Sequence, residues 1–159
     1  MPRTTLPPAA FLAIGVLSGC VGFRPLVAEV EKDGHKQTLT GYADPGQIQK
    51  GTIQARNGAY ICEGEIVRTQ RSRSAFSCDG QKGIARIRCR GEEPVQTTWT
   101  ALSCQTGYGS GTNSSGTVFK FAYSWSEADA AQHLAKVRVE PAGDAPSGAQ
   151  PSQAKPARR

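Results

Sequence analysis

The chain is poor in the residues that most often perform catalysis. Its 159 residues include two histidines, His35 in a Gly-His-Lys stretch expected to be a loop and His133 near the end of a predicted helix. It contains no Gly-x-Ser-x-Gly, no His-Glu-x-x-His and no phosphate-binding loop. Two acidic pairs are candidates for acid–base work, but no apolar pocket that would raise one pKa is evident beside them: Glu63/Glu65 and Glu92/Glu93. We therefore expect no catalytic residue, no cofactor and no enzymatic activity.

Long apolar runs are also missing. The apolar stretch from Ala9 to Leu17 has about half of the roughly 20 residues that a transmembrane helix needs. With Arg3 ahead of it, this stretch has the layout of a secretory signal, which is a positive start followed by a short apolar core. We expect residues 1–19 to be a signal peptide that is removed.

The apolar stretch closes with Leu17-Ser18-Gly19-Cys20, which resembles the lipobox of bacterial lipoproteins. The resemblance covers residues 1–20. It implies that the thiol of Cys20 carries diacylglycerol, that the chain is cut before Cys20 and that the new N-terminus is acylated. Because Val21 rather than Asp follows the Cys, it also implies the outer membrane, facing the periplasm, with the outer leaflet of the cytoplasmic membrane as the alternative. An ordinary signal peptide cut elsewhere would leave Cys20 as a plain cysteine.

Cysteine is scarce and odd in number, five in all. If lipid occupies Cys20, an even set remains, which in an oxidising compartment predicts two disulfides. The spacings are long and no Cys-x-x-Cys occurs, so we expect no metal site. The predicted disulfide residues are Cys62, Cys78, Cys89 and Cys104.

An internal repeat runs through the cysteine region. Cys62-Glu63-Gly64-Glu65 recurs as Cys89-Arg90-Gly91-Glu92, and Ser77-Cys78 recurs as Ser103-Cys104. We interpret each unit as a strand, a polar loop and a return strand. Of the three connectivities that four cysteines allow, the repeat favours pairing within each unit, Cys62–Cys78 and Cys89–Cys104.

The predicted fold class is mostly β, a small antiparallel sheet or barrel with this two-unit hairpin repeat, two disulfides and one short helix near 127–136. Period-two alternation predicts strands over 84–90 and 118–125. The composition of residues 113–116 predicts a hairpin turn, preceded by a glycine-rich strand over 107–112. Ser126 and Asp129 form a capping-box pair for the helix, whose shared face would comprise Ala128, Ala131, Leu134 and Ala135. Residues 137–139 are expected to add a final strand.

Three regions follow the signal peptide. Residues 20–50 are expected to be the lipidated Cys with a tether or partly ordered segment, in which 25–30 and 37–40 are candidate strands. Residues 51–140 form the β domain. Residues 141–159 hold no large apolar side chain and cannot offset their ordering entropy, so we expect a disordered tail.

One face of the 118–125 strand is aromatic. It presents Phe119, Phe121, Tyr123 and Trp125, and we expect this face to be the main core. Its expected partners in the core are Tyr60, Phe76 and Leu102.

Positive charge is concentrated in one segment. Residues 68–90 hold seven Lys and Arg against the single Asp79, although the whole chain has a net charge of only +6. Arginine forks match phosphate and carboxylate, so the segment predicts an anion-binding face, with a plain solvated strand face as the alternative. The candidate residues are Arg68, Arg71, Arg73, Arg86, Arg88 and Arg90.

Together these features predict a non-catalytic binding or structural module that is held at the bacterial envelope by lipid. Its partner would be an anionic envelope polymer, a lipid head group or an envelope protein, and not nucleic acid. Two other functions stay open. One is an accessory subunit of a secretion or assembly machine, and the other is an inhibitor of a cell-wall hydrolase such as lysozyme. A basic target would favour an acidic inhibitor surface, which this domain lacks.

Overall fold

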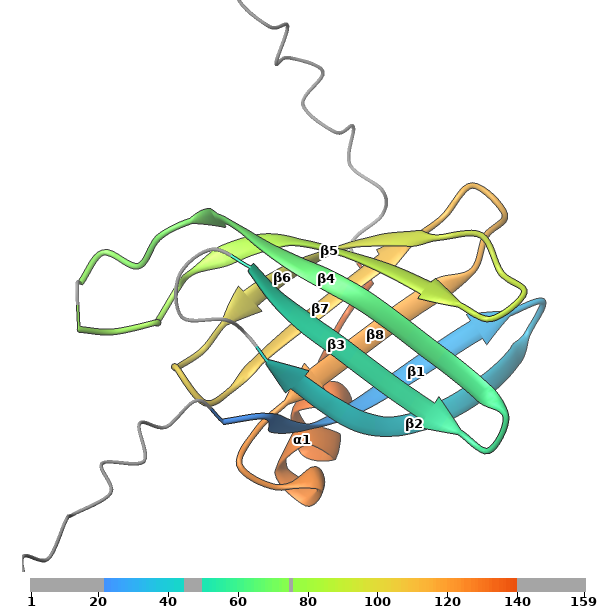
Figure 1. The fold of residues 1–159 in the computed structure, drawn as a ribbon, viewed down its shortest axis with the longest axis horizontal. Coiled ribbons are helices and arrows are strands. Elements are labelled where there is room, and N and C mark those ends of the chain that lie inside the picture. Colours follow the sequence, from blue (N-terminus) through green and yellow to red (C-terminus); the bar gives the residue numbers. More distant parts are fainter. Residues whose placement is uncertain (1–21, 45–49, 75, 140–159) are drawn as a thin grey trace, which may run out of the picture.

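The computed structural model describes residues 22–44, 50–74 and 76–139. The predicted signal peptide, Cys20 and the tail from residue 141 lie outside these residues. Within them, eight strands and one helix follow one another along the chain (Figure 1). They are β1 (Arg24–Lys32), β2 (His35–Asp44), β3 (Lys50–Asn57), β4 (Tyr60–Gln70), β5 (Lys82–Cys89), β6 (Val95–Ala101), β7 (Gly107–Thr112), β8 (Val118–Tyr123) and α1 (Glu127–Leu134).

The strands form a closed antiparallel barrel in which each strand pairs with its neighbours in sequence, and β1 pairs with β8 to complete the ring. Leu26 lies opposite Tyr123 and Ala28 opposite Phe121 across this closing seam. The barrel therefore begins at Arg24. The expectation that 20–50 is a tether or partly ordered segment placed the start of the β domain too late, because β1 and β2 are full members of the ring.

Alternation decides which side chains face the interior. On β5 the residues Ala85, Ile87 and Cys89 are buried, whereas Arg86 and Arg88 are exposed, as the sequence predicted. The same rule on β8 buries Phe119 and Phe121 in the interior. Apolar side chains from every strand except β7 thus fill the barrel, which is the expected state for an eight-stranded ring.

The interior beside β8 is shared between aromatic rings and glycines. Gly107, Gly109 and Gly111 of β7 lie opposite Tyr123, Phe121 and Phe119 of β8. A Cβ atom on Gly109 would lie 2.5 Å from a ring carbon of Phe121, and one on Gly107 would lie still closer to the Tyr123 hydroxyl. Glycine in this strand therefore leaves the space that the rings of Phe121 and Tyr123 occupy.

The predicted aromatic core is confirmed in part. Phe119, Phe121 and Tyr123 are buried and Tyr60 packs against the core from its edge. Trp125 is 65% exposed because β8 ends at Tyr123, so the alternation does not extend to it. Phe76 and Leu102 are also exposed, since both belong to loops that follow strands rather than to inward positions on strands.

The four cysteines form two disulfides, as predicted, but the predicted pairing within each unit is wrong. The bonds join Cys62 to Cys89 and Cys78 to Cys104. Cys62 near the start of β4 lies directly opposite Cys89 at the end of β5, so the antiparallel register brings these two thiols together. For the same reason the two sequence units are not equivalent hairpins: the first Cys begins one strand and its counterpart ends the next.

The helix α1 packs on the outside of the barrel against β1 and β8. Ser126 caps it, because its hydroxyl accepts from the Asp129 N–H at 3.1 Å, as predicted. The buried face consists of Ala130 and Leu134 rather than the predicted set with Ala128, Ala131 and Ala135, which are exposed. These two side chains contact Val27, Ala122 and Val137. Residues 137–139 do not form the expected strand.

The two ends of the barrel differ. At the turn end, on the right in Figure 1, short turns at 33–34, 58–59, 90–94 and 113–117 connect the strands. At the loop end, on the left, lie the start of β1, the end of β8 and the connections 71–81 and 102–106. The disulfide Cys78–Cys104 joins these two connections.

Candidate functional site

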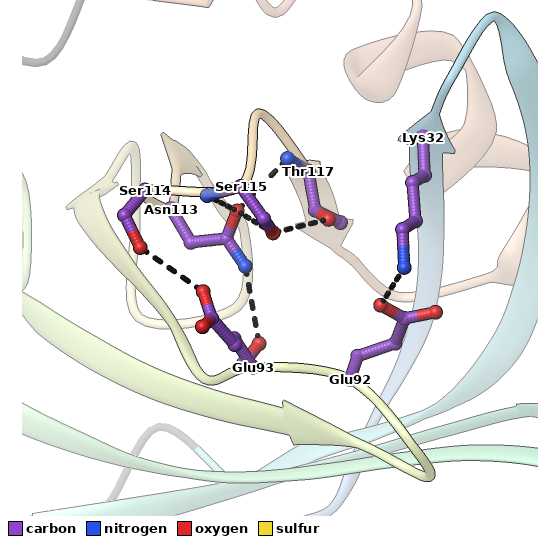
Figure 2. A network of polar contacts seen from close by, with 7 residues as sticks. All are labelled: Lys32, Glu92, Glu93, Asn113, Ser114, Ser115 and Thr117. Atoms are coloured by element: carbon purple, nitrogen blue, oxygen red, sulfur yellow. Dashed lines mark hydrogen bonds and ion pairs between the residues drawn. The ribbon is translucent and has the colours of Figure 1, made fainter.

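At the turn end, polar contacts connect the 90–94 turn to the end of β1 and to the 113–117 turn (Figure 2). The Nζ of Lys32 lies 2.5 Å from Oε2 of Glu92, and this hydrogen bond raises the pKa of Lys32. Ser114 donates to Oε2 of Glu93 at 3.0 Å, and the side-chain amide of Asn113 donates to the Glu93 carbonyl at 3.2 Å. The Oδ1 of Asn113 accepts from the N–H groups of its own turn, Ser115 at 3.1 Å and Thr117 at 2.9 Å. The acidic pair Glu92/Glu93 thus holds turns in place.

The second acidic pair lies on the outer face of β4 beside arginines. Glu63 lies opposite Arg88 and Glu65 opposite Arg86 in the register of β4 and β5. All four side chains are exposed. Opposite charges at such cross-strand positions attract each other and stabilise the sheet modestly. This arrangement explains the alternating charges of both strands without a catalytic role, and it reduces the positive field of Arg86 and Arg88.

The remaining arginines of the predicted anion-binding face do not lie beside Arg86 and Arg88. Arg68 is near the end of β4 and Arg71 and Arg73 follow in the 71–81 connection, all at the loop end. Arg90 lies in the 90–94 turn at the opposite end. The six predicted residues are therefore divided among three places, since a barrel strand carries its residues from one end to the other.

A different basic site lies on the outer wall of the barrel. A groove of about 680 Å³ runs over β5, β6 and β7 beneath the chain that leaves α1, and we call it the β5–β7 groove. Its polar lining supplies hydroxyls from β4, β6 and β7, namely Thr69, Thr98, Thr100, Tyr108 and Ser110. The hydroxyl of Ser110 donates to the Arg138 carbonyl at 3.2 Å, which holds the covering segment against β7.

The charges along this groove are all positive or neutral. Lys82, Lys136 and Arg138 line it together with the half-buried His133, and no Asp or Glu is among its lining residues in the part of the chain that the structure describes. Trp99 of β6 also contributes to the lining, but its side chain belongs to the barrel core, where the indole Nε1 is buried without a hydrogen-bond partner. Ammonium, guanidinium and hydroxyl donors in one concave site can together bind an anion that also carries hydroxyl groups.

Sequence reasoning missed this groove because its cations come from separate elements. Lys82 begins β5, whereas Lys136 and Arg138 follow α1 more than fifty residues later. Lys82 belongs to the basic segment, but its neighbours in that segment are arginines that lie elsewhere on the barrel. The signal that could have found the site is the basic character of the residues after the helix, where Lys136 and Arg138 are exposed.

Other kinds of site receive no support from the described residues. All four described cysteines are consumed in disulfides, and residues 22–44, 50–74 and 76–139 contain no group of three or more His, Cys, Asp or Glu placed to hold a metal. In the same ranges no helix has the length and apolar character required to cross a bilayer. No protein-family model, curated protein or solved structure matches the chain.

Proposed function

We propose that this chain is a bacterial envelope lipoprotein, held by lipid on Cys20, that binds an anionic envelope component without catalysing a reaction. The lipobox resemblance supports the anchor. The β5–β7 groove supports the binding role, and the observation that carries it is the gathering of Lys82, Lys136 and Arg138 in one groove without a lining carboxylate among the described residues. Elsewhere on the barrel wall the arginines of β5 lie opposite acids.

The ligand chemistry is a phosphate or carboxylate on a hydroxyl-rich body. Arg138 and the lysines would neutralise the anion, and the hydroxyls of Thr98, Thr100 and Tyr108 would bond to the body that carries it. In an envelope this chemistry has two sources, the phosphates of lipopolysaccharide and the carboxylates of peptidoglycan.

The anchor is tested by mass spectrometry of the N-terminal peptide from the mature chain, with Cys20→Ser as the comparison. We expect the mass of an acylated Cys in the natural chain and no acylated peptide from the variant. An unmodified Cys20 in mature protein would contradict the anchor. The proposed binding role of the β5–β7 groove would still stand, because it does not depend on the lipid.

The groove is tested by charge reversal. Detergent-solubilised mature protein is measured for capture by lipopolysaccharide micelles in one arm and by cosedimentation with peptidoglycan sacculi in the other. The variant Lys82→Glu/Lys136→Glu is compared with Arg56→Glu/Arg90→Glu, which changes the net charge equally at exposed positions outside the groove. We expect the first variant to lose about tenfold or more in affinity, equivalent to about 1.4 kcal/mol, in whichever arm binds.

The control variant should bind within about twofold of the natural chain, and added salt should weaken binding because the contact is electrostatic. Equal binding by the two variants would show that net charge rather than the groove is responsible, and it would refute the proposed site. Binding to sacculi alone or to micelles alone would identify the anion as carboxylate or phosphate.

A further inference from the structure

Exposed apolar side chains gather at one end of this barrel. Six large apolar side chains of the described residues are exposed, and each lies at the loop end or within a few residues of it. We call this set the apolar rim: Phe23, Tyr42, Val67, Phe76, Leu102 and Trp125. They come from the residue before β1, from β2 and β4, from the connections 71–81 and 102–106 and from the segment that follows β8, so they are distributed around the opening. The turn end carries the polar network of Figure 2 instead.

The rim is held by the fold. The disulfide Cys78–Cys104 joins the connection that carries Phe76 to the one that carries Leu102. The backbone of Gly80 donates to the Ala101 carbonyl and that of Ala101 to the Gln81 carbonyl, both at 2.9 Å. The guanidinium of Arg24 lies 4.8 Å from the ring centre of Trp125. Exposed apolar side chains that cluster on one part of a surface mark a site of contact with a protein, a ligand or a membrane.

Chain length limits what that contact can be. Cys20 precedes Arg24, the first residue of β1, by four residues, which span at most about 14 Å. The nine residues of β1 extend for about 30 Å, or roughly 23 Å along the axis of a barrel with tilted strands. A lipid on Cys20 can therefore reach the bilayer from the loop end but not past the turn end.

Positive charge accompanies the rim. Arg24, Arg68, Arg71, Arg73 and Lys82 lie at the loop end, where the acidic residues of the described strands and of the two connections are Asp44 and Asp79. The first turn of α1, which follows Trp125, adds Glu127 and Asp129. Aromatic side chains flanked by arginine are the combination that the boundary between head groups and acyl chains accommodates, because rings enter the apolar layer while guanidinium groups bind lipid phosphates.

We infer that the loop end is seated in the head-group region of the bilayer that holds the lipid anchor, with the apolar rim inserted and the polar turn end directed away from the membrane. This rests on the proposed lipid attachment of Cys20. Phe23 and Tyr42 border a hollow of about 460 Å³ with Thr52 and Gln54, next to the point where β1 begins. In this orientation the loop end contacts the membrane surface. The β5–β7 groove, which includes Lys82 and Leu102, then opens near the lipid head groups.

The chain supplies its own probe for this orientation. It has two tryptophans, of which Trp99 is 3% exposed inside the barrel and Trp125 is 65% exposed on the rim. Mature lipidated protein is reconstituted into anionic vesicles with and without bromine on the acyl chains, and the Trp125 emission is obtained by subtracting that of Trp125→Phe. We expect bromine to reduce the Trp125 emission by about half, because a rim seated about 5–10 Å deep brings the indole to the chains. The Trp99 emission should stay unchanged.

Arginine variants supply the matched control. Arg71→Glu/Arg73→Glu should reduce the quenching of Trp125, whereas Arg56→Glu/Arg90→Glu, with the same change of charge away from the rim, should leave it unchanged. Unquenched Trp125 in protein whose N-terminal peptide carries lipid would overturn the orientation and leave the anchor standing. An N-terminal peptide without lipid would overturn the anchor and, with it, this inference.

Discussion

Replacing Gly109 by Ala tests whether the glycines of β7 exist to make room for the aromatic core. The added Cβ would lie 2.5 Å from Cε1 of Phe121, 2.6 Å from its Cζ and 2.5 Å from the carbonyl oxygen of Thr98. These separations are about 1 Å too short for carbon contacts. Phe121 is fully buried, so its ring has no empty space into which it can move.

The expected loss of unfolding free energy follows from two opposing effects. Overpacking a core costs about 1–3 kcal/mol, and the Thr98 backbone contact places this site toward the upper value. Ala instead of Gly restricts the unfolded chain, which stabilises the fold by about 0.4–1 kcal/mol. The net expectation is a loss of about 2 kcal/mol, measured by urea unfolding followed by far-ultraviolet circular dichroism.

Two further variants make this test specific. Gly22→Ala places its Cβ only against the flexible side chain of Arg24, with a nearest separation of 3.1 Å, and should change stability by less than about 0.5 kcal/mol. Phe121→Leu removes the ring atoms that the new methyl group of Gly109→Ala would strike, so the double variant should be more stable than the sum of the single losses by about 1 kcal/mol. A Gly109→Ala protein as stable as the natural chain, or strictly additive losses, would refute the proposed fit of ring to glycine.

Three other predictions concern the disulfides, the core tyrosine and the helix cap. Peptide mapping without reductant should recover peptides linked by Cys62–Cys89 and by Cys78–Cys104, whereas a peptide linked by Cys62–Cys78 would contradict the register of β4 and β5. Replacing either pair by Ser should lower the unfolding free energy by about 3.5 kcal/mol, since the bridged residues are 27 and 26 positions apart. Burial raises the pKa of Tyr123 above its ordinary value near 10, so the stability that this residue contributes should be fully present below about pH 10 and decline as the pH rises further. When the unfolding free energy is measured between neutral and alkaline pH, Tyr123→Phe should show a shallower decline than the natural chain, and identical slopes would argue against a buried hydroxyl. Ser126→Ala should lower the unfolding free energy by about 1 kcal/mol and speed amide hydrogen exchange in α1, and Ser126→Thr should restore most of that loss. Unchanged exchange in Ser126→Ala would mean that the packing of Leu134, without the cap, holds the helix.

Local rules explain the parts of this fold that its sequence predicts. The alternation of Ala85, Arg86, Ile87 and Arg88 assigns their faces because a strand has a strict period of two. The turn at 113–116 and the cap at Ser126 depend on residues only a few positions apart. Each of these features needs no knowledge of which strand lies next to which.

The features that sequence reasoning missed depend on register and closure. The pairing Cys62–Cys89 requires knowing that β4 and β5 place these residues directly opposite, and a repeat in sequence carries no such information. The β5–β7 groove requires α1 to fold back over β8 and β1 so that Lys136 and Arg138 reach the wall that holds Lys82. Extending the alternation past the strand end at Tyr123 places Trp125 wrongly in the core.

The pairing of β1 with β8 has a consequence for how other molecules can recognise this protein. Among the strands that the structure describes, each has a hydrogen-bonded neighbour on both sides, so the ring presents no free strand edge. A partner peptide cannot extend this sheet by β-augmentation, and two copies cannot join edge to edge without opening the ring. Recognition must therefore pass through side chains on the wall, the rim or the turns. Deleting β8 would expose two edges at once, on β1 and on β7, and would turn the barrel into an aggregation template.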